Sequence, residues 1–260
     1  MAKTSRHTKR ARPNRRLWNL GQRPKRRTHR FRWLRKFPIK LFLGLICVFL
    51  LFEIFTLPLF SIANLETDNP KVTALMQQRM AEAKEQAKAF RLDYRWVPLS
   101  SIPKHVRMAV LVAEDSAFYT HAGVDWHEVW ESVETNWEEG RIVRGGSTIT
   151  QQLAKNLYLS TSKDPIRKFK ELVITWILEA RLTKKRILEL YLNIIEWGPG
   201  IFGIEAAAQR HFHKPALRIT REEGARLAAV IPSPLRRRPT DDNDYVNNKT
   251  QLILKRMSTR

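Results

Sequence analysis

Apolar residues recur at every third or fourth position along most of this chain, and no convincing segment alternates between apolar and polar residues. The first spacing places apolar side chains on one face of a helix, whereas alternation would indicate strands. One example lies between residues 125 and 140, where the recurring positions are Trp126, Val129, Trp130, Val133 and Trp137. The pattern predicts an all-α fold in which helices pack around a cleft, with no internal repeat.

The starts of several helices are marked by capping residues. Asp164 followed by Pro165 is typical of a helix start, Thr183 can cap the next helix, and Thr220 with Glu223 forms a capping-box pattern. We therefore expect helices over residues 72–92, 104–115, 125–140, 164–182, 183–197 and 220–231. In the helix over 164–182, the expected core stripe is Ile166, Phe169, Val173, Trp176 and Ala180.

Positive charge is concentrated at the N-terminus. Residues 1–40 hold 16 of the 47 lysines and arginines and none of the 25 acidic residues, and Leu41 to Phe60 is an almost uninterrupted apolar run. About 20 apolar residues cross a bilayer as a helix, and a basic flank stays in the cytoplasm. We expect a basic cytoplasmic tail over 1–40, a single transmembrane helix over 41–60, a linker and membrane-proximal helix over 61–95, and the main domain over 96–260.

Two other interpretations of the N-terminal region stay open. Ser61-Ile62-Ala63 has the small-x-small pattern of a signal-peptide cleavage site, although the apolar run is longer than such a signal needs. A basic tail can also bind nucleic acid, but the membrane interpretation requires no further partner. Cys47, the only cysteine, lies in the apolar run, so an intrachain disulfide is excluded.

The most unusual segment runs from Gly145 to Asn156 and reads GGSTITQQLAKN. Two glycines and three hydroxyl residues open a predicted helix that carries two amides and a lysine along its first turns. Such a segment contributes little to a core, but free N–H groups at a helix N-terminus and a nearby ammonium favour an anion. The segment predicts a site for phosphate and sugar.

Carboxylates and cations occur together at two other places. Val106 and Val110 indicate a buried helix that ends in Glu114, and partial burial would raise the pKa of this carboxyl and suit it to general acid–base work. The alternative is that Glu114 and its neighbour Asp115 are solvated charges at a helix end.

The second place is the start of the helix over 164–182. Arg167 and Lys168 precede Glu171 by four and three residues, so all three share one side of the helix. This is an exposed ion-pair face or a site for a diphosphate. Further along, Gly198, Gly200 and Gly203 predict a tight helix-to-helix turn with close backbone approach, which is a structural role.

Taken together, these segments resemble the five sequence motifs of the family 51 glycosyltransferases, the peptidoglycan polymerases. The first motif is matched by Glu114, Asp115, Phe118, His121 and Gly123, the second at every fixed position from Gly145 to Asn156, and the third by Arg167, Lys168 and Glu171. The fourth is matched by Ile187 to Asn193 and Gly203 to Ala207, and the fifth, more loosely, by Leu227 to Pro234. The resemblance covers residues 97 to 240 and implies a lysozyme-like helical domain. Because the chain stops at Arg260, it is similar to the monofunctional transglycosylases.

The resemblance implies a role for each matched residue. Glu114 would be the general base, and Glu171 the second catalytic carboxylate, orienting a diphosphate through Mg²⁺, the one cofactor implied. The cations implied to bind that diphosphate are Lys155, Lys163, Arg167 and Lys168. The other implied substrate-binding residues are Asp115, Phe118, Ser147, Thr148, Gln151, Gln152 and Asn156, with His121 mainly structural.

The implied reaction joins lipid II disaccharide units into a β-1,4 glycan by one inverting displacement, releasing undecaprenyl diphosphate. Lipid II, the growing glycan strand, the membrane and other cell-wall synthesis proteins would be partners, without nucleic acid. The expected location is the bacterial inner membrane, with the N-terminus cytoplasmic and the catalytic domain periplasmic. A lysozyme-like hydrolase and a non-enzymatic membrane protein stay as alternatives, but neither needs the Gly145 to Asn156 segment or the basic cluster around Glu171.

Overall fold

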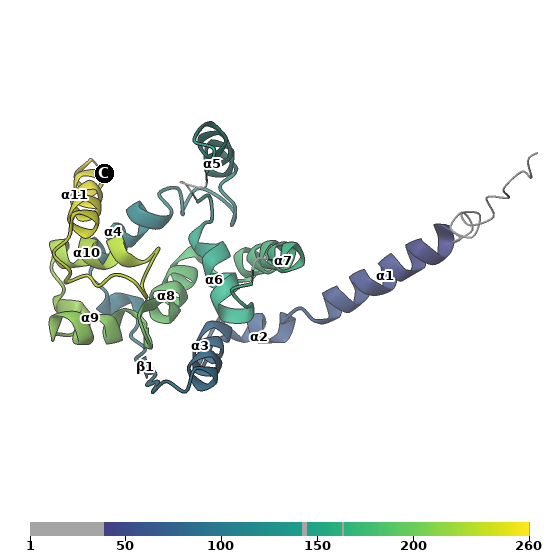
Figure 1. Cartoon of the computed structure of the whole chain (residues 1–260), viewed down its shortest axis with the longest axis horizontal. Coiled ribbons are helices and arrows are strands. Elements are labelled where there is room, and N and C mark those ends of the chain that lie inside the picture. Colours follow the sequence, from purple (N-terminus) through teal and green to yellow (C-terminus); the bar gives the residue numbers. More distant parts are fainter. Residues whose placement is uncertain (1–38, 142–144, 163, 260) are drawn as a thin grey trace, which may run out of the picture. The chain divides into compact units, whose positions relative to one another are not determined.

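Helices account for most of the part of the chain that the computed structural model describes, which comprises residues 39–141, 145–162 and 164–259 (Figure 1). The α-helices are α1 (Ile39–Phe55), α2 (Leu59–Asn64), α3 (Ala74–Glu85), α4 (Lys104–Glu114), α5 (Trp126–Glu138), α6 (Ile149–Tyr158), α7 (Pro165–Arg181), α8 (Lys184–Ile194), α9 (Ile204–Phe212), α10 (Arg221–Val230) and α11 (Asp244–Ser258). Single 3₁₀ turns occur at Leu99–Ser101 and Ala216–Arg218. The predicted tail over 1–40, apart from its last two residues, and Lys163 lie outside the described residues.

The chain divides into two compact units, residues 1–55 and 56–260. In the first unit, α1 is the apolar helix, but it ends at Phe55 and is therefore shorter than the helix predicted over 41–60. The next helix, α2 in the second unit, begins after Pro58, whose ring nitrogen has no hydrogen to continue a helix. Among the described residues, no helix combines the length and apolar character needed to cross a membrane.

The second unit contains a small sheet that the sequence pattern did not reveal. Its strands are β1 (Asp93–Tyr94), β2 (Glu196–Gly198) and β3 (Ile201–Phe202), in the order β1-β3-β2. β1 pairs with β3 in parallel, and β2 pairs with β3 antiparallel with an irregular register. Strands of two or three residues are too short for an alternating pattern to be recognised, so the all-α prediction holds for the bulk of the unit and misses this sheet.

The predicted turn at Gly198, Gly200 and Gly203 is the hairpin that joins β2 to β3 and leads into α9. Gly203 has φ +83°, and a Cβ atom there would lie 2.4 Å from the carbonyl oxygen of Asn193. Gly200 has φ +73°, and a Cβ atom there would lie 2.5 Å from the carbonyl oxygen of Arg91. The expected close backbone approach is confirmed, and both positions require glycine.

The predicted helix starts are confirmed at three capping residues, but several helix ends differ. Thr183 accepts a hydrogen bond from the Arg186 N–H, and the capping box of Thr220 and Glu223 is formed. The helix predicted to reach residue 92 ends at Glu85. A helix at the position of α9 was implied only by the predicted helix-to-helix turn. The helix α11 was not anticipated, although Asn243 caps it with a side-chain hydrogen bond and basic residues occupy its last turn.

The core of the second unit surrounds α8, in which Tyr191 is fully buried. α6 packs against α8, α7 and α3, while α4 packs against α10 and α11. These contacts place the C-terminal end of α4 near the N-terminal half of α6, as the side-chain bond between Glu114 and Gln152 shows.

The core stripe predicted for α7 is wrong. Ile166, Phe169 and Trp176 are 43%, 58% and 46% exposed, whereas the helix buries Glu171, Ile174, Thr175 and Leu178. α5 shows the same inversion, because its tryptophans are exposed and its buried residue is Ser132. In α7, the buried Glu171 is paired with Arg167 and Lys168 of the same helix.

Candidate active site

A cavity of about 990 Å³ lies where the end of α4, α5, the loop over 145–148 and α11 meet. Its lining is mainly polar and includes five of the predicted site residues: Glu114, Asp115, Ser147, Thr148 and Gln152. The cavity therefore joins the first two sequence motifs. It confirms the expectation of helices around a cleft.

Glu114 is the last residue of α4 and reaches the cavity. Burial raises the pKa of its carboxyl above the usual value, while a hydrogen bond from Gln152 and the charges of Lys249 and Lys155 oppose that rise, and the charge of Asp115 adds to it. The Gln152 Nε2 atom lies 2.8 Å from the Glu114 Oε2 atom. The solvated-charge alternative is therefore excluded, and the position suits a general base.

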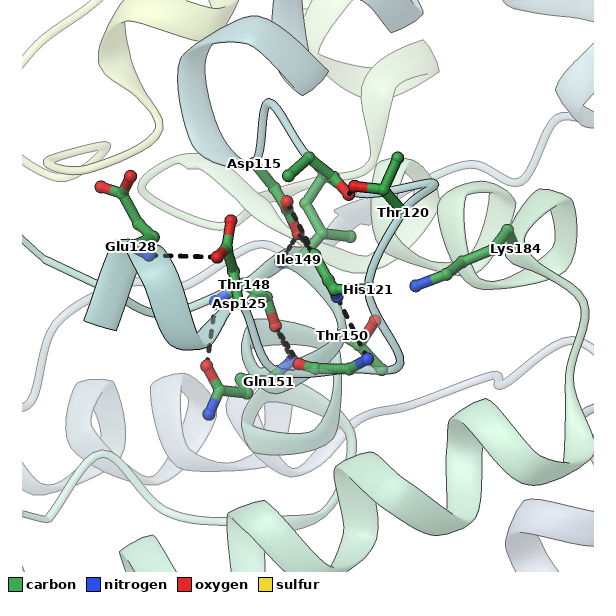
Figure 2. A network of polar contacts seen from close by, with 12 residues as sticks. Asp115, Thr120, His121, Asp125, Glu128, Thr148, Ile149, Thr150, Gln151 and Lys184 are labelled. Carbon is green, nitrogen blue, oxygen red and sulfur yellow. Dashed lines mark hydrogen bonds and ion pairs between the residues drawn. The ribbon is translucent and has the colours of Figure 1, made fainter. Parts of the chain in front are cut away.

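Asp115 follows directly but faces the protein (Figure 2). Its carboxylate lies 2.9 and 3.1 Å from the His121 Nε2 atom and accepts the N–H of Ile149 at 3.0 Å. The Nδ1 atom of His121 accepts the N–H of Gly123, so Nε2 carries the proton that is donated to Asp115. This buried group ties the end of α4 to the first turn of α6.

Three backbone N–H groups at the start of α6 have partners within the protein. The Thr148 hydroxyl accepts the N–H of Gln151, the Gln151 amide oxygen accepts the N–H of Thr148, and the N–H of Ile149 is held by Asp115. The Thr148 hydroxyl also donates to the carbonyl of Gly123 at 2.6 Å. The prediction that free N–H groups at this helix start bind an anion is therefore wrong for these three groups, because they already have partners.

A second polar contact holds this turn from the other side. The Thr150 hydroxyl donates to Glu179 on α7 at 2.5 Å, and Lys184 on α8 lies 2.8 Å from the same Glu179 oxygen. The N-terminal turn of α6 is thus fixed to α4, α7 and α8. Its rigidity sets the position of the side chains that follow along the helix.

Cations gather on the next turn of α6 and on the start of α7. Glu171 is buried and is paired with Arg167 at 2.8 Å and with Lys168 at 2.5 Å. Burial lowers the pKa of Lys155, the charge of Glu171 opposes this, and the charges of Arg167 and Lys168 lower it further. Three cations around one carboxylate leave excess positive charge, which favours an anionic ligand. Lys168 also reaches the Ser147 hydroxyl at 3.4 Å.

The magnesium ion expected at Glu171 stays a prediction. Both oxygens of Glu171 have cationic partners, Arg167 and Lys168, and the part of the chain that the structure describes has no group of three or more His, Cys, Asp or Glu able to hold a metal. A magnesium ion at this place would have to displace one of these cations and take its other ligands from a bound diphosphate.

None of the other predicted site residues that the structure describes lines the cavity. Phe118 is 1% exposed and belongs to the core, with the Lys184 ammonium 4.5 Å from its ring centre. Gln151 and Asn156 are buried within α6, and Gln151 is held in the capping box. We attribute structural roles to Phe118 and Gln151, because their surfaces are enclosed by the protein.

The sequence interpretation missed the wall of the cavity that α11 supplies. Tyr245, Lys249, Arg256 and Thr259 line the cavity, and the Arg237 guanidinium stacks 3.6 Å from the Tyr245 ring centre. These residues lie more than 120 positions after Glu114 in a helix that was not anticipated. The Asn243 cap could have revealed that helix but not the face it presents.

Tyr191 was also missed as a site residue, although it lies within the fourth motif. Its hydroxyl donates to the Gln152 amide oxygen at 2.9 Å. The motif match marked this tyrosine without indicating its partner, since the contact joins two different helices.

Comparison with known proteins agrees with this geometry. A family model described as Transglycosylase matches residues 81–258. Proteins named biosynthetic peptidoglycan transglycosylase are similar to this chain. That of Laribacter hongkongensis is 42% identical over 216 residues, covering 83% of this chain and 93% of the relative. That of Dechloromonas aromatica is 41% identical over 226 residues, covering 87% and 95%. That of Nitrosospira multiformis is 44% identical over 191 residues, covering 74% and 83%. The predicted resemblance is thereby confirmed, and this chain belongs to the transglycosylase family.

Proposed function

We propose that this chain polymerises the glycan strand of peptidoglycan, joining lipid II disaccharide units in β-1,4 linkage and releasing undecaprenyl diphosphate. Family membership supports a peptidoglycan glycosyltransferase. The observation that carries the proposal is the placement of a desolvated carboxylate, Glu114, beside a helix whose next turn enters a cluster of cations around Glu171. A base and a diphosphate site are the two elements that the reaction needs.

The reaction is one inverting displacement at the anomeric carbon of the donor sugar. The acceptor 4-hydroxyl oxygen forms the new bond to that carbon as the bond from the carbon to the diphosphate oxygen breaks, and the hydroxyl proton moves to Glu114. The negative charge that grows on the leaving diphosphate is stabilised by Lys155, Arg167 and Lys168, an electrostatic effect of several kcal/mol in a partly dry site. The ionised form of Glu114 is therefore the active form.

Through Gln152 and Lys155, the helix α6 serves both the base and the diphosphate-binding cations. Gln152 and Lys155 are three residues apart on α6, so their side chains lie on the same side of the helix. Gln152 contacts the base, and Lys155 interacts electrostatically with both Glu114 and Glu171. The rigid first turn of α6 thus sets the distance between the base and the diphosphate-binding cations.

A gel assay with purified protein and lipid II in detergent tests the proposal. The wild type should produce a ladder of long glycans, and Glu114→Gln should produce none. Glu223→Gln is a matched control, because Glu223 lies in the capping box of α10, where glutamine also serves. A wild type that leaves lipid II intact but degrades finished peptidoglycan would replace the polymerase with a hydrolase.

We also propose that the chain works at the bacterial inner membrane, with its basic tail in the cytoplasm and its catalytic unit outside. The apolar helix α1 has 17 residues, fewer than the about 20 that usually cross a bilayer, and follows a strongly basic segment of the kind that stays at the cytoplasmic side of a membrane. Within the second unit, α5 and α7 expose large apolar side chains that suit a lipid interface: Trp126, Trp130, Trp137, Ile166, Phe169 and Trp176. Flotation with lipid vesicles, with and without residues 1–55, tests this location; recovery of the full chain in the lipid-free fraction would contradict it.

A further inference from the structure

We propose that Tyr191 is a positioning residue that acts on Glu114 through Gln152, with its hydroxyl fixing the direction of the Gln152 amide so that the NH₂ group faces the carboxylate. This inference rests on the proposed function, in which Glu114 is the base. It adds a member of α8 to a site otherwise built from α4, α6, α7 and α11.

The geometry is a chain of three groups on three helices. Tyr191 on α8 is fully buried, and its hydroxyl donates to the Gln152 Oε1 atom at 2.9 Å. The Gln152 Nε2 atom on the neighbouring helix donates to the Glu114 Oε2 atom at 2.8 Å. Both ends of the amide are therefore used, one by the tyrosine and one by the glutamate.

The direction of this chain follows from the chemistry of its members. An ionised carboxylate only accepts hydrogen bonds, an amide accepts at one end and donates at the other, and a phenol does either. Glu114 in its ionised form therefore requires the NH₂ end of Gln152, which leaves the carbonyl end for Tyr191. Burial keeps the pKa of Tyr191 well above its usual value, so the hydroxyl retains the proton that it donates.

The same three groups disfavour the protonated base. A protonated Glu114 carries an O–H donor, and Gln152 could accept it only by turning its carbonyl oxygen toward Glu114. The buried Tyr191 hydroxyl would then lose the acceptor that it has in the structure, which costs free energy. Tyr191 therefore favours the ionised base.

Other charged groups face Glu114, and all of them remain in a Tyr191 variant. Lys155 on α6 and Lys249 on α11 favour its ionised form, and Asp115 disfavours it. The further charged residues that line the cavity are Asp125 and Glu128 from α5 and Arg256 from α11. Because none of them bonds the Tyr191 hydroxyl, removing that hydroxyl changes the Gln152 amide alone.

The test is the pH dependence of kcat for lipid II polymerisation in Tyr191→Phe, which keeps the ring and loses one oxygen. With the amide free to turn its carbonyl toward Glu114, the acidic limb of the profile should move up by about half a pH unit to one unit, with KM little changed. The Glu114 carboxyl pKa, read by ¹³C NMR in the substrate-free protein, should move by the same amount.

A double-mutant cycle shows whether Tyr191 acts through Gln152. Gln152→Leu alone should raise the acidic limb, and adding Tyr191→Phe to it should cause no further shift. Tyr158→Phe is the matched control, because this tyrosine lies on α6 and its hydroxyl contacts Ser61 rather than the site. An unchanged limb in a folded, active Tyr191→Phe enzyme overturns the inference alone, as do additive shifts in the double variant. A wild type that makes no glycan overturns the proposed function instead.

Discussion

Replacing Asp115 with asparagine tests whether this carboxylate holds the site together or binds substrate, as the sequence motif implied. In the structure, Asp115 accepts from the His121 ring and from the Ile149 N–H. An asparagine has one acceptor oxygen, and its NH₂ group would meet one of these two donors. The variant therefore loses a hydrogen bond to a charged group and leaves a buried donor without a partner.

The expected cost is that of one hydrogen bond. Loss of a hydrogen bond to a charged group costs about 1.5 to 3 kcal/mol, and the buried donor left without a partner places the cost at the upper end of this range. We expect about 3 kcal/mol in the free energy of unfolding. For a unit of this size, 1 kcal/mol corresponds to roughly 2–4 °C, so the Tm should fall by about 6–12 °C.

Thermal unfolding in detergent measures this change, with Asp125→Asn as the matched control. Asp125 caps α5 by accepting the N–H of Glu128, and asparagine caps a helix about as well as aspartate. The control should shift the Tm by no more than about 1 °C. An Asp115→Asn protein that melts like the wild type but has lost lipid II binding would refute the structural role and restore the substrate-binding one.

Three other predictions concern the base, the cations and the hairpin. In a profile of kcat against pH, activity should fall on the acidic side at a pH above the ordinary glutamate pKa, because burial raises the pKa of Glu114 and only its ionised form is active. Lys249→Met should move this fall to a still higher pH, because it removes a charge that favours the ionised form. Lys155→Met should lower kcat about 10²- to 10³-fold with little change in Tm, and an equal loss confined to KM would contradict its role at the leaving group. Gly203→Ala should prevent folding or lower the Tm severely because of its positive φ and close carbonyl contact, while Gly140→Ala, also at positive φ but in open space, should cost only about 1 kcal/mol in thermal unfolding.

Local signals in the sequence predicted three helices that begin with a side-chain cap. Thr183, Thr220 and Asp164 each cap a helix as expected, because a cap depends on residues within one turn. The exposure of α7 could not be predicted in the same way. Its apolar stripe has the right period for a core face, but the helix buries the side that carries Ile174 and Leu178 instead. Periodicity shows that a face is apolar and does not show what covers it.

The motifs grouped residues that have different surroundings in the structure. Glu114 lines the cavity, and Arg167 and Lys168 pair with Glu171, so their roles in catalysis and binding stay predictions. Phe118 and Gln151, by contrast, belong to the core and to a cap. A motif contains residues that bind substrate and residues that only support the site. A single sequence does not distinguish these two roles.

The sequence by itself determined the helical class, most helix starts, the basic N-terminus and the family, because these depend on short-range pattern and on motif matches. Only the tertiary structure decided which side chains meet. It brought Asp115 to the first turn of α6, Tyr191 to Gln152, and Lys249 of α11 to the cavity of Glu114. Each of these contacts joins residues 34 or more positions apart. Their pairing depends on the packing of helices, which no local pattern encodes.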